Sequence, residues 1–384
     1  MGGGIGAGTR WASRTQFFAS GFIFATWGVH IPTVKGHYAV DEAQLGFAML
    51  AAGFGALAGL SRAGHWIGRY GARDTARLCG TVYALLIAAL IVMPGYGALL
   101  GLLAVFGIAT GVFDVAINTE AAKLELLDGG TLMSGMHGMF SLGGMAGAMT
   151  GGAALAAGMS PQTHLLWVAG VTALAILLAS QYMLPRAATS SASPVAEGFS
   201  LPRGALVILG VLAALGLIAE GAIYDWSVLY LQQELGSPQG QAALAYASFS
   251  AAMAAARFGG DAMRARFAPA VLLRGSAVLA AAAMALVLVA RQPWLALVGF
   301  AGVGVGFANV VPILFSAAAR VPGVDPARGI AAVSAAAYLG FMAGPPAIGF
   351  VARVSSLGWA LWLVVGFAVA LAASARRVDA PPQG

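Results

Sequence analysis

Cysteine is nearly absent from this chain, and its absence removes several kinds of site. Of the 384 residues only Cys79 carries a thiol, so no disulfide can form within the chain and no cluster of cysteines can hold zinc or an iron–sulfur centre. The glycine-rich loop followed by Lys and Ser or Thr that binds nucleotide phosphates is also missing, which argues against direct coupling to ATP. We therefore expect no metal ion and no cofactor.

Charge is scarce as well. Asp, Glu, Lys and Arg make up 9% of the chain, whereas 60% of it is hydrophobic; a soluble protein carries about 25% charged residues. So few charges cannot cover a surface that faces water, and the composition predicts an integral membrane protein. The short alternating segments of transmembrane β-strands are missing, so we expect every span to be an α-helix.

Apolar runs of about 20 residues, each long enough to cross a bilayer as a helix, recur along the whole chain. We expect twelve of them, roughly at residues 14–34, 43–62, 76–94, 98–122, 132–157, 163–184, 204–232, 241–260, 270–291, 294–319, 328–352 and 357–375. The first run is too long for the apolar part of a signal peptide and lacks an Ala-x-Ala exit, so we expect no cleavable leader. Abundant glycine and alanine suit closely packed spans.

The positive charges indicate the orientation. With the N-terminus placed in the cytoplasm, all but four of the 20 Lys and Arg residues fall on the cytoplasmic side; Lys35, Arg291 and Arg353 fall outside, and Arg257 lies within a span. This asymmetry satisfies the positive-inside rule. The net charge of +6 therefore reflects membrane topology, and we expect no nucleic-acid partner. Both termini are expected in the cytoplasm of a bacterial inner-membrane protein.

The chain contains an internal repeat. Residues 185–202, rich in Ser, Ala and Pro, divide the spans six and six. Leu142–Gly147 matches Leu339–Gly344, and Arg69-Tyr70 matches Arg266-Phe267, at nearly the same offset. Two parallel six-helix repeats are typical of one architecture of secondary transporters. We expect an N-terminal bundle over residues 1–184, a cytoplasmic linker over 185–203 and a C-terminal bundle over 204–384.

The repeat also draws attention to Asp114, the one ionisable group between Leu99 and Asn118. Segment Gly107–Val115 matches Gly302–Val310 with its glycines in register, and Asn309 stands in the second copy where Asp114 stands in the first. A carboxylate at membrane depth is costly unless it is paired or protonated, and such residues usually serve protons, ions or substrate. Proton chemistry at this level is thus expected in the first repeat alone.

The loop Gly64–Arg73 resembles the signature loop of the major facilitator superfamily, with Gly68 in place of the usual acidic residue. Within that superfamily the chain resembles the YbjJ-type bacterial inner-membrane permeases and, more distantly, the fucose permease branch. The residues that carry this closer resemblance are Asp114–Asn118, Met136–Gly143, Ala219–Trp226, Arg257–Gly260, Tyr338-Leu339 and Gly344–Pro346. The resemblance implies a proton-coupling role for Asp114 and a sugar-contacting role for the position of His137. An aspartate of the fucose branch is missing here near Gly28.

Two acids are our candidates for proton coupling, Asp114 and Glu220, because burial in an apolar medium favours the neutral form of a carboxyl group. Asn118 and Tyr224 each lie four residues after one of these acids and share its helix face. A structural hydrogen bond is the alternative interpretation of Asp114 and Asn118. The predicted solute-binding residues are Trp27, Asn118, His137, Ser141, Tyr224, Asn309 and Tyr338.

Other polar residues are assigned gating or structural roles. His30 lies near the outer end of the first span, where gating and plain interfacial placement stay open. Asp225 and Trp226 form either an outer gate or an interfacial anchor. Arg257 is expected to pair with Asp261, four residues later. In the signature loop, Arg69 and Arg73 complete this group.

The predicted function is secondary active transport of a small polar solute, sugar-like or another small metabolite, by a monomer working through alternating access, with proton symport favoured. Proton-driven efflux of drugs or metabolites is the alternative within this class, and a receptor that has lost transport is the alternative outside it. Ser141 and His137 lie four residues apart, but neither a third partner nor an oxyanion hole is evident, so we do not expect an enzyme.

Overall fold

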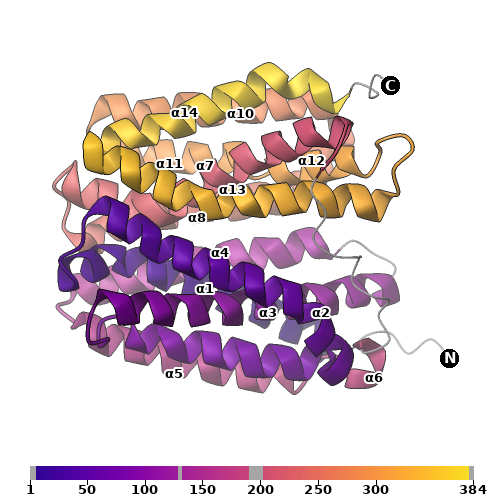
Figure 1. Ribbon diagram of the computed structural model, residues 1–384, viewed down its shortest axis with the longest axis horizontal. Helices are drawn as coiled ribbons and strands as arrows, with labels where there is room; N and C mark the ends of the chain where they lie inside the picture. Colours follow the sequence, from indigo (N-terminus) through magenta and orange to yellow (C-terminus); the bar gives the residue numbers. More distant parts are fainter. Residues whose placement is uncertain (1–5, 129–131, 190–201, 380–384) are drawn as a thin grey trace. The chain divides into compact units, whose positions relative to one another are not determined.

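The computed structural model describes residues 6–128, 132–189 and 202–379, with the backbone alone at 261 and 327. Within these ranges every regular element is a helix. The linker expected at 185–203 is described only at its two ends, and residues 190–201 lie outside the described part. Figure 1 shows the helices of each half of the chain running alongside one another.

The first half contains the following helices: α1 (Ala7–His37), α2 (Glu42–Leu86), the 3-10 helix η1 (Ile87–Ala89), α3 (Tyr96–Asp128), α4 (Met133–Ala156), α5 (Pro161–Ser180) and α6 (Arg186–Thr189). The second half contains α7 (Ala205–Gln233), α8 (Gln239–Phe258), α9 (Gly260–Arg266), α10 (Pro269–Ala290), α11 (Pro293–Phe307), α12 (Val310–Ala318), α13 (Pro326–Val354), α14 (Leu357–Ser374) and η2 (Ala375–Val378).

The contacts divide the chain into two compact units. Unit 1 comprises residues 1–40, 51–195 and 239–243, and unit 2 comprises residues 41–50, 196–238 and 244–384. The first turn of α8 thus belongs to unit 1 and the remainder of this helix to unit 2. In the same way, the first residues of α2 belong to unit 2.

Ten of the described helices are long and apolar enough to cross a membrane. One of them, α2 with η1, covers 48 residues and passes through Gly71, whose backbone angles (φ 81°, ψ 162°) are not helical. A positive φ is readily adopted only by glycine, which explains why Gly71 occupies the kink. The kink divides α2 into two segments that correspond to the second and third predicted spans. With α2 counted as two segments, α11 and α12 together as one, and the more polar α8 included, the described chain contains twelve segments of spanning length.

The tenth predicted span, residues 294–319, is not a continuous helix. It divides into α11 and α12 at Ala308 and Asn309. Pro312 explains the break, because proline has no N–H to donate to the carbonyl of residue 308 and its ring clashes with that group. Arg264 of α9 donates from Nη1 to Oδ1 of Asn309 at the break, over 3.0 Å.

Glycines set the closest helix contacts of unit 1. A Cβ atom at Gly107 of α3 would lie 1.9 Å from the carbonyl oxygen of Ala52 on α2, and one at Gly55 of α2 would lie 1.9 Å from that of Ala104 on α3. The two backbones therefore touch directly, as small residues allow within membranes. This packing fixes the orientation of the central part of α3.

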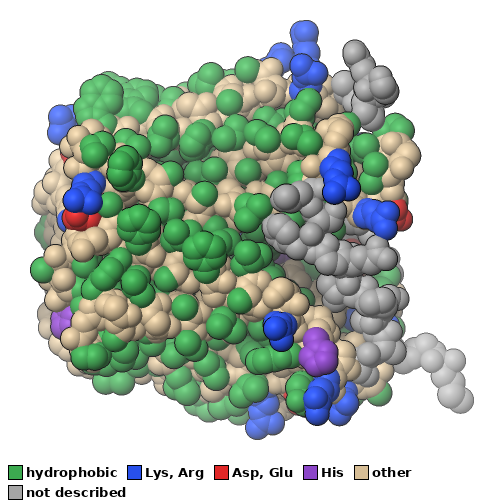
Figure 2. Space-filling model, viewed as in Figure 1, with side chains coloured by type: hydrophobic (Ala, Val, Ile, Leu, Met, Phe, Trp, Pro, Cys, Tyr) green, Lys and Arg blue, Asp and Glu red, His purple; other side chains and the backbone are tan. Residues whose placement is uncertain are grey.

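Figure 2 shows hydrophobic side chains over the middle of the helices and Lys and Arg toward their ends. Large apolar side chains such as Leu174 and Val289 are exposed. A soluble protein rarely exposes an apolar area of this extent, whereas lipid accommodates it.

Candidate functional site

In unit 1 the candidate site is built on one turn of α3. Asn118 donates from Nδ2 to the Asp114 carboxylate oxygen Oδ1 over 3.1 Å and to the Asp114 carbonyl oxygen over 2.9 Å. Both residues are half-buried. No Lys or Arg of the described chain forms an ion pair with Asp114. The carboxyl group therefore keeps the capacity to bind a proton or to face a cation.

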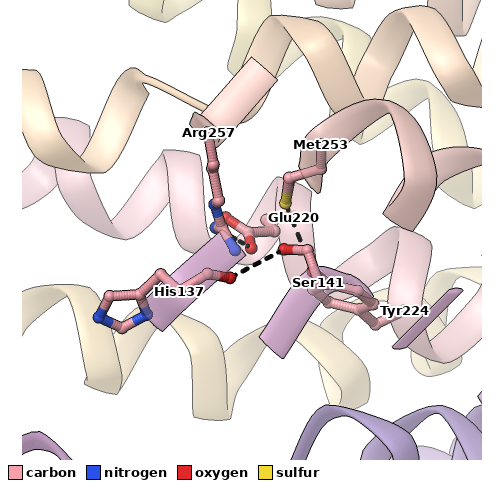
Figure 3. Close-up of polar contacts among 6 residues, drawn as sticks. All are labelled: His137, Ser141, Glu220, Tyr224, Met253 and Arg257. Carbon is pink, nitrogen blue, oxygen red and sulfur yellow. Dashed lines mark hydrogen bonds and ion pairs between the residues drawn. The ribbon is translucent and has the colours of Figure 1, made fainter. Parts of the chain in front are cut away.

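In unit 2 the candidate site joins α7 and α8. Arg257 donates from Nη2 to Oε1 of Glu220 over 2.9 Å, and the two side chains are 17% and 11% exposed. Tyr224, one turn after Glu220, donates its hydroxyl to the sulfur of Met253 over 3.4 Å. Figure 3 shows Arg257 reaching Glu220, with Tyr224 and Met253 beside the pair.

The two sites differ in charge compensation. The carboxylate of Glu220 pairs with Arg257 from the neighbouring helix, whereas the one side-chain donor that the described residues give to the Asp114 carboxylate is the amide of Asn118 on its own helix. We expected Arg257 to pair with Asp261, whose side chain lies outside the described part of the chain; Glu220 is one partner of Arg257 among the described residues.

Loss of the arginine is expected to destabilise unit 2. Arg257→Met leaves the carboxyl group of Glu220 without its cationic partner in an apolar setting, and removal of one partner of a buried pair costs about 3–5 kcal/mol, or about 2 kcal/mol here because both groups are partly exposed. Glu220→Gln combined with Arg257→Met removes both charges and should recover part of this loss. Thermal unfolding of the wild type and of these two variants in detergent measures the loss and its recovery; equal midpoints for the single and double variants would contradict an ion pair.

The remaining predicted solute-binding residues are divided between the units. In unit 1, Ser141 is buried and its hydroxyl donates to the carbonyl oxygen of His137 over 3.3 Å, the ring of His137 stacks edge-on against Phe17, and Trp27 is buried. In unit 2, Asn309 is 5% exposed and Tyr338 is 39% exposed.

The residues predicted to lie near the outer side are buried within the protein. His30 is fully buried, and its Nε2 lies 2.9 Å from Nδ1 of His164 on α5. Trp226 is also fully buried, and its ring packs inside unit 2, in reach of α13 at Gly349; the choice between an outer gate and an interfacial anchor stays a prediction. Asp225 is buried beside it at 6% exposure.

Two titratable residues had escaped the sequence analysis, His164 and Glu120. Glu120 is fully buried near the end of α3, and its Oε1 accepts from the backbone N–H of Leu184 over 2.7 Å. Glu120 and His164 each interrupt an apolar run of the sequence, and this interruption could have identified them as candidates.

Arg73 of the predicted loop contacts the end of α5. It donates from Nε to the carbonyl oxygen of Ser180 over 2.7 Å and from Nη2 to that of Gln181.

Arg69, the other basic residue predicted in this loop, makes a local contact. Its guanidinium lies over the ring of Tyr70, 5.4 Å from the ring centroid. The kinked loop of α2 is thus held against the end of α5 by Arg73, while Arg69 remains exposed.

Comparison with known proteins decides the family. The sequence model described as Major Facilitator Superfamily matches residues 15–327. The chain belongs to the Major Facilitator Superfamily. An uncharacterized MFS-type transporter of Yersinia pestis is 33% identical over 367 residues, which cover 96% of this chain and 95% of the relative.

Solved structures of the superfamily agree in fold. A D-xylose-proton symporter matches with a TM-score of 0.76 and 14% identity over 96% of both chains. A variant of the fucose:proton symporter FucP of E. coli matches with a TM-score of 0.64 and 18% identity over 96% of this chain and 97% of that one. The predicted all-α membrane fold and the resemblance to this superfamily are confirmed. The protein is therefore a multi-pass membrane transporter of a small solute and not an enzyme.

Proposed function

We propose that this protein is a proton-coupled secondary transporter of a small polar solute, with Asp114 as the principal proton-binding group. One observation carries the proposal: Asp114 lies inside a membrane-spanning helix, and its only hydrogen-bond donor among the described residues is Asn118 on the same helix. A carboxylate in this position needs a proton or a cation. Protonation would neutralise the site and permit reorientation, which links solute movement to the proton gradient.

Glu220 is the second group of the proposal. Protonation of Glu220 would break its ion pair with Arg257 and so change the contact between α7 and α8. Tyr224 and Asn118 are proposed to bind the solute next to these acids. His137, Ser141, Trp27, Asn309 and Tyr338 complete the proposed set.

The topology is part of the same proposal. Residues 1–184 and 204–384 would form two six-helix bundles joined by a cytoplasmic linker, in a monomer of the bacterial inner membrane with both termini inside. The distribution of Lys and Arg in the sequence supports this orientation. Symporters for xylose and fucose among the similar structures support a sugar-like solute.

A proton-flux assay tests the proposal without a labelled solute. Purified protein in liposomes that contain a pH-sensitive dye is exposed in turn to sugars, nucleosides, amino acids and amines. Symport predicts that a transported solute carries protons inward and acidifies the interior, whereas proton-driven efflux predicts the opposite sign. Empty liposomes provide the control. Solute uptake with no proton movement at any pH would exclude coupling, and ligand binding without any flux would favour a receptor.

A further inference from the structure

Two buried histidines, His30 and His164, contact each other near the C-terminal end of α1. His30 of α1 is 0% exposed and His164 of α5 is 1% exposed. Their rings are joined by the 2.9 Å contact between Nε2 of His30 and Nδ1 of His164. The transport mechanism proposed above uses neither residue.

The pair is the centre of a short chain of hydrogen bonds. Nδ1 of His30 lies 3.4 Å from the hydroxyl of Thr33. Gln239, the first residue of α8, donates from Nε2 to that same hydroxyl and to the carbonyl oxygen of Val29, each over 2.8 Å. The two imidazoles are thereby connected to the first turn of α8, all within unit 1.

A second contact holds the same turn. A Cβ atom at Gly240 would lie 2.7 Å from the carbonyl oxygen of Gly152 on α4, and one at Gly151 would lie 3.3 Å from Cε1 of His164. The start of α8 therefore packs on α4 directly beside the histidines. The turn belongs to unit 1 only as far as Ala243.

The hydrogen bond between His30 and His164 limits the number of protons that the two rings can carry. A hydrogen bond between two imidazoles needs one N–H and one free lone pair, so hydrogen-bond counting alone permits this bond with no extra proton or with one, and the cost of the buried charge decides between these two states. In both cases Nε2 of His164 is buried without a partner in the described part of the chain. A second extra proton would place N–H groups on both facing nitrogens and break the bond.

Among the described residues, no carboxylate forms a hydrogen bond or an ion pair with either ring of the pair. His30 contacts His164 and Thr33, and His164 contacts His30 and lies beside Gly151 of α4. A buried charge with no counter-ion is strongly unfavourable. Proton uptake therefore favours an arrangement in which the rings reach water.

We propose that His30 and His164 form a proton-sensitive latch, which holds the first turn of α8 against α1 and α4 while it is neutral and releases that turn when it takes up a proton. The sign follows from burial of the neutral form: the closed contact is present above the range in which exposed histidine titrates, roughly pH 6.5, and weakens below it. The latch is independent of the role of Asp114.

Hydrogen exchange of the full-length protein in lipid nanodiscs tests the latch. After correction for the intrinsic effect of pH, amides of the peptide that covers residues 237–246 should exchange about tenfold faster at about pH 5.5 than at about pH 8. His30→Gln and His164→Gln keep polar side chains that cannot titrate, and each should reduce this difference to less than about twofold. His65→Gln, a change at an exposed histidine of α2, is the matched control and should behave as the wild type does.

Gln239→Ala provides a measurement that does not require substitution of the buried rings. Without the contact to Thr33 and Val29, the peptide should exchange fast at both pH values. The proposal is overturned if the wild-type peptide shows no dependence on pH, if the histidine variants retain the full dependence, or if Gln239→Ala protects the peptide as well as the wild type at about pH 8.

Discussion

Asp114→Asn is expected to abolish accumulation of solute driven by a pH gradient while it leaves solute exchange intact. A gradient of about 2 pH units supplies about 2.7 kcal/mol per proton and can support about 100-fold accumulation when one proton accompanies each solute molecule. Asparagine resembles the protonated carboxyl group in shape but cannot titrate. The variant should therefore equilibrate its solute to a ratio of about 1.

The measurement compares accumulation and exchange in the same liposomes, with the solute identified by the proton-flux screen. Asp128→Asn is the matched control: Asp128 is an acid of the same helix, near its end, where it pairs with Arg10, and its loss should leave accumulation unchanged. Accumulation by Asp114→Asn at the level of the wild type, with the same pH dependence, would remove Asp114 from the coupling mechanism.

Gly107→Ala is expected to destabilise the protein more than a Gly→Ala substitution at any other glycine of α3. The new Cβ atom would lie 1.9 Å from the carbonyl oxygen of Ala52 and 2.8 Å from the backbone nitrogen of Ala56. Both neighbours are backbone atoms of α2, so no side chain can rotate away and the two helices must separate. Overpacking of this severity costs about 4 kcal/mol.

Thermal unfolding in detergent measures the effect as a fall of about 5 °C or more in the unfolding midpoint, together with less monodisperse protein. Gly101→Ala is the control on the same helix, because a Cβ atom there meets nothing within 4 Å. Alanine favours a helix by about 1 kcal/mol over glycine, so the control should be at least as stable as the wild type. Equal loss in both variants would contradict close packing of α2 and α3.

The features that depend on local sequence were predictable. Asn118 bonds to Asp114 because residues four apart share a helix face, and this pair could be predicted from spacing. The number of spans and their approximate ends follow from hydropathy. Pro312 could have predicted the break before α12, although residues 294–319 were expected to form one helix. The kink at Gly71 coincides with the loop that was predicted after the second span.

The partners of the buried polar residues were not predictable in this way. Arg257 bonds to Glu220, 37 residues away, and His30 bonds to His164, 134 residues away. Asn309 accepts a hydrogen bond from Arg264 of α9, 45 residues away. In each case the residue type indicated a costly buried group, but not the group that satisfies it.

By itself, the sequence determined that this chain is a helical membrane transporter and that Asp114 and Glu220 lie inside its spans, because composition, periodicity and internal repetition are properties of the chain alone. Only the tertiary structure decided that Glu220 is compensated by Arg257 while Asp114 receives no cation from the described residues. The physical reason is that helix periodicity gives the face and the depth of a side chain, whereas the identity of the helix opposite that face depends on how glycine-lined surfaces pack together.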